Sequence, residues 1–190
     1  GAEEILRRQF LASVIDTLAR ENHPAIPSGG HGGGTAKTAL GATGEGSLIT
    51  TLCERIERDG ALLVQAFTDA FQERTPALDR LRAWVTQDSG AGPREMLQRA
   101  AAEHRAESEQ LHRQERQIRE ALPELKVAAE RPNATEEDTR AHRSAEGARK
   151  AAESRIFDLD REHWVSALER HGVLPNYTLI DDSVRLSARV

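Results

Sequence analysis

Hydrophobic residues recur at helical spacing along most of the chain, and the pattern is most regular between Pro93 and His171. The first half of this stretch places apolar, small or interrupting polar residues at alternating intervals of four and three: Leu97, Ala101, His104, Ser108, Leu111, Glu115, Ile118 and Leu122. After a polar turn at 130–135 the same rhythm returns, beginning with small residues: Ala141, Ala145, Ala148, Ala152, Ile156, Leu159 and His163. This alternation is the period of the seam between coiled helices. We therefore expect residues 93–171 to form a long antiparallel hairpin that resembles a coiled coil.

Local signals mark the ends of the two hairpin helices. Thr135, followed three residues later by Asp138, resembles a capping box and predicts the start of the second helix. Gly172 is the expected stop of that helix, just after His171, because glycine adopts the left-handed conformation that ends many helices. Pro123 is expected to kink or end the first helix late in its course, since proline removes a backbone donor.

The chain before the hairpin begins with a helix and a glycine-rich stretch. Residues 2–22 predict an amphipathic helix, whose apolar positions recur every three or four residues: Ile5, Leu6, Phe10, Leu11, Val14, Ile15 and Leu18. Pro24 and Pro27 are expected to stop this helix. Residues 23–46 hold most of the glycine, show no periodicity and predict a flexible linker.

Two further segments complete the predicted organisation. Residues 47–92 predict a helical base, in which Thr75 is the expected N-cap of a helix that starts at the following proline. Residues 172–190 predict a short extended segment, because Val184 and Leu186 alternate with polar residues as they would in a strand.

Composition agrees with a fold built from helices. Hydrophobic residues make up 38% of the 190 residues, aromatic residues only 4% and charged residues 30%. So few large rings leave a thin core, which suits packed helices better than a compact enzyme. We therefore predict an all-α helical bundle, dominated by the hairpin and followed by the short extended C-terminal segment.

The single cysteine and the lack of a long apolar run indicate the environment of the chain. Cys53 has no second cysteine with which to form an internal disulfide bond, so a reducing cytoplasm is the expected location. No apolar run approaches the roughly 20 residues that span a bilayer, so no membrane partner is expected. Cys53 also falls within the apolar stripe of its helix, and we interpret it as a buried structural thiol in preference to a nucleophile.

Two partial motifs fall short of a catalytic or metal site. Gly29 and Gly34 have the separation found in a phosphate-binding loop, but two residues intervene before Lys37. Glu109 and His112 match one Glu-x-x-His pair of a di-iron bundle, which needs a second such pair and two further glutamates. The sequence therefore predicts no catalytic residue, no metal and no cofactor in this chain.

Arginine is the main basic residue and is concentrated on the predicted hairpin. The arginines of the two arms are Arg99, Arg105, Arg113, Arg116, Arg119, Arg140, Arg143, Arg149 and Arg155. They alternate with glutamates, which is typical of a solvated helix face linked by ion pairs one turn apart. The formal net charge of −5 agrees with this interpretation, because it argues against a surface that is basic everywhere. A local phosphate-binding strip is the best functional alternative, since a guanidinium group fits phosphate.

Two short stretches resemble a known family of proteins. They are Ile5-Leu6-Arg7-Arg8-Gln9-Phe10-Leu11-Ala12 near the start and His171-Gly172-Val173-Leu174-Pro175-Asn176-Tyr177-Thr178-Leu179 near the end. Together they resemble the accessory region that follows the motor domains in large bacterial DEAD/DEAH-box helicases of superfamily two. In such proteins a helix with an Arg-Arg-Gln type motif follows the second motor domain, and a Leu-Pro-x-Tyr segment opens the next folded part. The chain itself has no Walker A motif and no Asp-Glu-x-His box.

The resemblance implies a non-catalytic accessory domain of an ATP-dependent DNA helicase-like protein. Its expected partners are DNA and the motor domains of the same polypeptide, and ATP would bind only to that parent motor. The arginines that we expect to contact nucleic acid are Arg7, Arg8, Arg113 and Arg116. The alternative is a protein-interaction or oligomerisation module, in which the hairpin pairs with a second chain.

Overall fold

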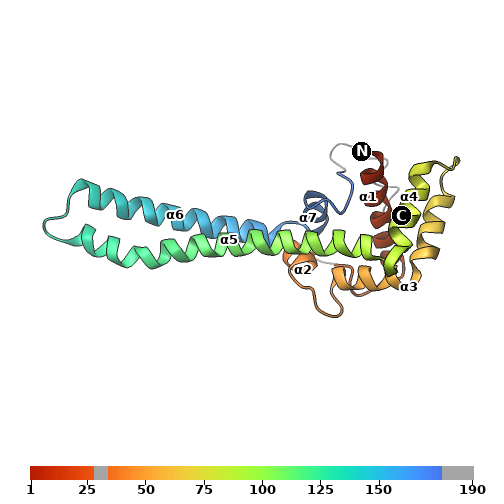
Figure 1. The fold of residues 1–190 in the computed structure, drawn as a ribbon. Coiled ribbons are helices and arrows are strands. Elements are labelled where there is room, and N and C mark those ends of the chain that lie inside the picture. Colours follow the sequence, from red (N-terminus) through yellow and green to blue (C-terminus); the bar gives the residue numbers. More distant parts are fainter. Residues whose placement is uncertain (28–33, 177–190) are drawn as a thin grey trace. The chain divides into compact units, whose positions relative to one another are not determined.

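The described part of the chain is built from helices (Figure 1). A computed structural model describes residues 1–27 and 34–176. The α-helices are α1 (Ala2–Arg20), α2 (Ala36–Leu40), α3 (Leu48–Asp69), α4 (Pro76–Thr86), α5 (Ala91–Glu130), α6 (Glu136–Arg161) and α7 (Trp164–Arg170), with one 3₁₀ turn, η1 (Gln87–Ser89). The described residues contain no strand, and their isolated β-bridge joins Thr35 to His163. The predicted all-α fold class is confirmed.

Contacts within the chain divide it into two units. Among the described residues, the core unit comprises 1–27, 34–104 and 162–176, and the hairpin unit comprises Arg105–Arg161. Helix α5 contributes its first part to the core unit and its second part to the hairpin unit. None of the helices in the described part of the chain has a stretch that is both long and apolar enough to cross a membrane.

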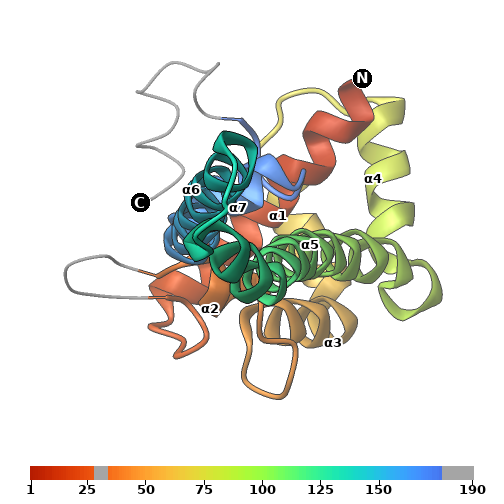
Figure 2. The ribbon, with the colours of Figure 1, turned by 90° about the vertical axis from the view of Figure 1, so that its left-hand side faces the viewer.

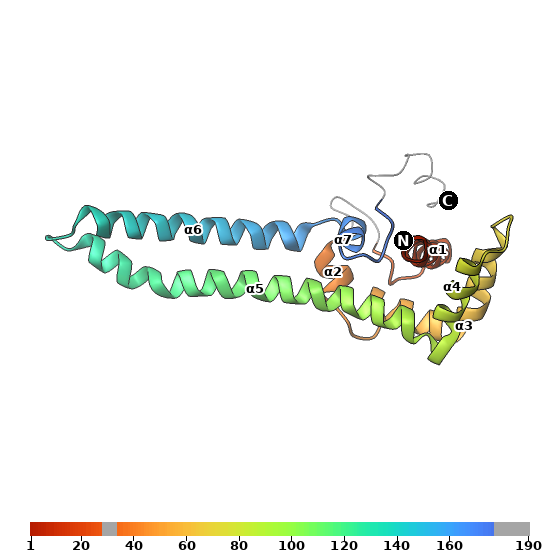
Figure 3. The same cartoon turned by 45° about the horizontal axis from the view of Figure 1, so that its top comes forward.

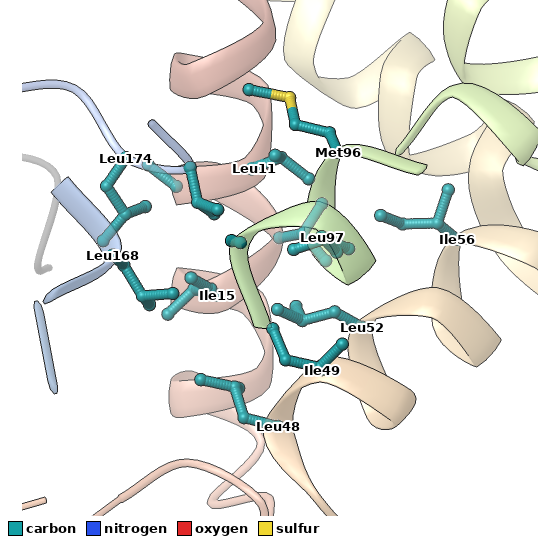
Figure 4. Packing of buried hydrophobic residues seen from close by; sticks show 14 of the residues in the cluster. Leu11, Ile15, Leu48, Ile49, Leu52, Ile56, Met96, Leu97, Leu168 and Leu174 are labelled. Atoms are coloured by element: carbon teal, nitrogen blue, oxygen red, sulfur yellow. The ribbon is translucent and has the colours of Figure 1, made fainter. Parts of the chain in front are cut away.

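The core unit buries apolar side chains from several helices against one another. In Figure 4, Leu11 and Ile15 of α1, Leu52 of α3, Leu97 of α5 and Leu168 of α7 converge. Helix α1 also lies beside α4 (Figure 2). Each such side chain contributes about 1.5–3 kcal/mol when it leaves water completely. Because aromatic rings are scarce, leucine, isoleucine and alanine provide most of this core.

Helix ends in the core unit follow the local signals in the sequence. The Thr75 side chain accepts a hydrogen bond from the backbone N–H of Leu78 at 3.3 Å, as the predicted N-cap requires. Gly172 adopts a φ of +79° just after α7, the conformation expected for a glycine that ends a helix. The backbone N–H of Val173 then donates to the carbonyl of Leu168 at 2.8 Å. Val173 and Leu174 are buried, and the predicted strand around Val184 and Leu186 lies outside the described residues.

The second long helix ends earlier than its periodicity predicts. The sequence predicts a continuous helix to His171, but α6 ends at Arg161 and α7 begins at Trp164. His163 occupies the N-cap of α7, where its Nδ1 accepts a hydrogen bond from the backbone N–H of Val165 at 3.3 Å. The expectation of one continuous helix is therefore wrong.

The break between α6 and α7 is stabilised by hydrogen bonds to part of the predicted glycine-rich linker. Within 23–46, the described residues include helix α2, in which Ala36, Ala39 and Leu40 are fully buried. The Ala36 N–H donates to the carbonyl of Glu162 at 2.7 Å, and the Trp164 N–H donates to the carbonyl of Gly34 at 3.0 Å. These bonds satisfy backbone groups that the helix break frees. The linker prediction is wrong for residues 34–40, and residues 28–33 lie outside the described part.

In the hairpin unit, α6 runs antiparallel to the second part of α5 (Figures 1 and 3). The Thr135 N–H donates to Asp138 Oδ2 at 3.0 Å, and the Asp138 N–H donates to Thr135 Oγ1 at 3.1 Å. This reciprocal pair is the predicted capping box. Helix α5 continues through Pro123 to Glu130, so Pro123 does not end the helix.

The inner faces of the two hairpin helices match the predicted positions on α5 and differ on α6. On α5 the least exposed positions include four that the pattern predicts: Leu111, Glu115, Ile118 and Leu122. On α6, Ala152 and Leu159 are buried as predicted, whereas Ala148 is exposed. His142 and Arg149 are partly buried in place of the neighbouring alanines. Long polar side chains cover apolar surface with their stems, which a pattern of apolar letters does not register.

Replacing Leu97 by alanine tests the core. Leu97 is 0% exposed, and Leu97→Ala leaves a cavity among α1, α3 and α7. We expect the free energy of unfolding to fall by about 2–5 kcal/mol, measured by urea denaturation followed by circular dichroism. Leu62, which is 74% exposed, provides the control. Leu62→Ala should change the free energy of unfolding by less than about 0.5 kcal/mol. Equal effects of the two substitutions would contradict this assignment of the core.

Candidate nucleic-acid interface

Arg7 and Arg8, predicted to contact nucleic acid, both lie on α1 in the core unit and make contacts within the chain. The Arg7 guanidinium carbon lies 4.9 Å from the centroid of the Trp84 ring, in a cation–π contact that links α1 to α4. Arg8 Nη2 lies 3.3 Å from Glu4 Oε1, one turn earlier on the same helix. Both arginines are half-buried. A phosphate group would therefore compete with contacts that these side chains already make.

Arg113 and Arg116, the other two predicted contacts, are exposed on α5 in the hairpin unit. Arg113 Nη1 donates a hydrogen bond to the amide oxygen of Gln110 at 2.6 Å. Arg116 has no carboxylate partner among the described residues. Arg113 and Arg116 lie on one helix of the hairpin unit, and Arg7 and Arg8 lie on a helix of the core unit. The four predicted residues are therefore divided between two units.

One flank of the hairpin unit is hollowed and almost free of charge. The hollow, with a volume of about 350 Å³, is lined by Gln114, Gln117, Ile118, Ala148, Ala151, Ala152 and Arg155. These residues come from both α5 and α6 and therefore lie on the same side of the hairpin unit. We call this side the hollow flank. Alanine occupies most of the α6 side, and Arg155 is its charged member.

The opposite flank carries basic residues. Arg116 follows Gln114 by two residues, a rotation of about 200° around α5, and Lys150 is separated from Ala148 by the same rotation around α6. Arg143 lies seven residues before Lys150 and therefore on nearly the same face. We call Arg116, Arg143 and Lys150 the basic flank. Carboxylates lie near this flank as well, because Glu120 follows Arg116 by one turn and Glu146 lies one turn from both Arg143 and Lys150.

Ion pairs within the hairpin occupy some of the carboxylates near the basic flank. Glu115, whose side chain is 11% exposed, lies 3.5 Å from Arg119 Nη1 and 3.5 Å from Arg149 Nε across the seam. Arg149 Nε also lies 3.1 Å from Glu153 Oε1, and His142 Nε2 lies 3.1 Å from Glu146 Oε1. In the described chain, by contrast, Arg116, Arg143 and Lys150 have no such partner. The three cations of the basic flank are therefore exposed and not engaged in ion pairs within the described chain.

Lys150 was not predicted from the sequence as a contact residue, and Arg143 was predicted only as one of the hairpin arginines. The available signal was the seven-residue spacing from Arg143 to Lys150, which keeps two residues on one helix face. The face that carries Lys150 follows from the register of α6. The sequence pattern placed Ala148 at the seam, whereas in the structure Arg149 faces Glu115 there.

Two histidines and a glutamate form a polar cluster in the core unit. His171 Nδ1 lies 3.1 Å from Glu103 Oε2, and the rings of His171 and His104 meet edge to face with centroids 6.1 Å apart. His104 is 2% exposed. These contacts link α5 to the end of α7. Within residues 1–27 and 34–176, no three histidine, cysteine or acidic side chains are grouped closely enough to hold a metal ion.

Cys53, on α3, is half-buried against the core. The pKa of its thiol is raised to about 11, mainly by burial, with Arg94 lowering it and the carboxylates of Glu54 and Glu57 adding to the rise. A thiol with such a pKa is protonated at neutral pH and is a poor nucleophile.

Comparison with known proteins returned no match: no family model, no curated protein and no solved structure resembles the chain closely enough to be significant. The arrangement of side chains is therefore the basis for a functional assignment.

The raised pKa of Cys53 predicts slow reaction with thiol reagents. At about pH 8 we expect the native protein to react with a disulfide reagent much more slowly than the urea-unfolded chain, because unfolding restores the ordinary pKa. Since the folded pKa is the higher one, the stabilising effect of the protonated thiol is complete below its ordinary pKa of 9.0 and is lost as the pH rises towards 11. Equal rates for native and unfolded protein would contradict this interpretation.

Proposed function

We propose that the chain is a non-catalytic helical module that contacts the nucleic-acid backbone through the basic flank of its hairpin unit. The observation that carries this proposal is that Arg116, Arg143 and Lys150 are exposed on one flank and have no carboxylate partner within the described chain. The family resemblance adds the setting, in which the module is an accessory part of an ATP-dependent DNA helicase-like protein. The motor domains of the same polypeptide would then supply ATP hydrolysis.

Backbone contact fits the chemistry of this flank. Arginine and lysine release condensed counterions when they neutralise phosphates, so binding depends on local charge and not on the net charge of −5. Arg116 follows Glu115 and Lys150 follows Arg149, and the contact between Glu115 and Arg149 places these two cations at one level on neighbouring helices. The two helices thus hold the backbone positions of these cations side by side, and the side chains are ordered only on binding.

The module has a positioning role in this proposal. A helical arm that binds backbone phosphates would hold the nucleic acid in a fixed orientation while an attached motor moves it. Arg113 lies near the basic flank and extends it on α5. Arg7 and Arg8 stay predictions, with smaller expected contributions because of their contacts to Trp84 and Glu4.

Removing two cations of the basic flank tests the proposal. We expect Arg116→Ala/Lys150→Ala to weaken binding to labelled DNA by about tenfold or more at low salt. The slope of log affinity against log salt should fall by about 2, since each phosphate contact contributes about 0.9. Fluorescence anisotropy at several salt concentrations measures both quantities.

A second double variant, Arg20→Ala/Arg155→Ala, removes the same charge from positions outside the basic flank and provides the control. Arg20 is exposed at the end of α1, and Arg155 lies on the hollow flank. Equal losses in the two variants would assign binding to overall charge. Failure of the unchanged protein to bind DNA at low salt would contradict the proposal itself.

The hollow flank favours a second candidate function, self-association of the hairpin unit. Interface cores are depleted in charged residues, and alanines allow helices to approach closely. On this alternative, the molar mass from light scattering rises to that of a dimer with concentration, and Ala148→Glu returns it to that of a monomer. A constant monomer mass over a wide concentration range would contradict self-association.

A further inference from the structure

Phe157 is an exposed aromatic residue on the hairpin unit. It is the one phenylalanine, tyrosine or tryptophan among residues 105–161, and 57% of its surface is exposed. The neighbouring seam positions Ile156 and Leu159 face inward, so Phe157 projects away from the seam. A large ring in this position adds little to the packing of the two helices.

The ring continues the line of the basic flank. Phe157 follows Lys150 by seven residues, as Lys150 follows Arg143. Seven residues complete almost two helical turns, so these three side chains share one face of α6 at intervals of about 10.5 Å. Two cations and an aromatic ring thus form one row along the helix.

An arginine covers one face of this ring. The Arg161 guanidinium carbon lies 5.0 Å from the centroid of the Phe157 ring, one turn later on α6. The cation–π contact orients the ring and adds positive charge beside the acidic side chains of Asp158 and Asp160. The ring is therefore already held in position, and its exposed surface is available to a planar group.

We propose that Phe157 is a base-stacking residue and that the basic flank binds single-stranded nucleic acid. This inference rests on the proposed function and specifies its ligand. Proteins that bind single strands combine a cationic track for the phosphates with aromatic side chains on which bases stack. Here Arg143 and Lys150 provide the track and Phe157 provides the stacking surface. Bases inside a duplex stack on one another, so a duplex offers this ring no free base face.

The test compares Phe157→Ala with Phe157→Trp in the full chain. Labelled single strands of one mixed sequence, as DNA and as RNA, and the corresponding DNA duplex are titrated at low salt. We expect Phe157→Ala to weaken single-strand binding roughly five- to hundredfold and to leave duplex binding unchanged. Phe157→Trp should keep the single-strand affinity, and its added fluorescence should be quenched by the bound strand beyond any change in the unchanged protein.

Val127→Ala is the matched control, because Val127 is an exposed apolar residue of the same unit, 54% exposed on α5. Helical content measured by circular dichroism confirms that each variant is folded. An equal loss of single-strand and duplex binding, or no loss, would overturn the stacking role while leaving the proposed function intact. Absence of binding to any of the three probes by the unchanged protein would overturn both. Equal affinities for the DNA and RNA single strands would support the stacking role. A higher affinity for one of them would indicate that the sugar is a further contact.

Discussion

The structure depends on the burial of one face of α5. This helix supplies Leu97, Ala100 and Ala101 to the core unit and, further along, Leu111, Ile118 and Leu122 to the hairpin unit. Its face contains polar residues as well, and each of these requires a partner where water is excluded. Glu115 has Arg119 and Arg149, and His104 packs against the ring of His171. In this chain, which has few aromatic rings, the apolar face of α5 is narrow. The polar contacts on that face determine which helices pack against it.

Most of the elements follow from local sequence, and the exceptions have identifiable causes. The helix caps at Thr75 and Thr135 were predictable because their hydrogen bonds join residues three apart. Helix α2 and the break before α7 were not, because the bonds between 34–36 and 162–164 join segments distant in sequence. Helix α2, which contains the buried Leu40, packs against α7, and no local pattern within residues 23–46 indicates that contact.

The candidate interface was predictable only in part, for a related reason. Arg116 stands out because α5 carries large apolar residues whose period fixes its inner face. On α6 the apolar pattern is mostly alanine, and a row of alanines looks the same when it is shifted by one residue. The contact between Glu115 and Arg149, together with the burial of Ala152 and Leu159, removes that ambiguity and defines which face bears Lys150 and Phe157. Charged residues in the seam thus carry the information about register that the apolar residues lack.

The turn at the end of the hairpin has a consequence for the length of this module. The bonds between Thr135 and Asp138 are made entirely within the turn and the first residues of α6, so the turn closes without help from the rest of the chain. Adding or removing seven residues in each arm keeps the same faces together and moves the turn by about 10.5 Å. The length of the two hairpin helices can therefore change during evolution in increments of two helical turns, with no change in the sequence of the core unit.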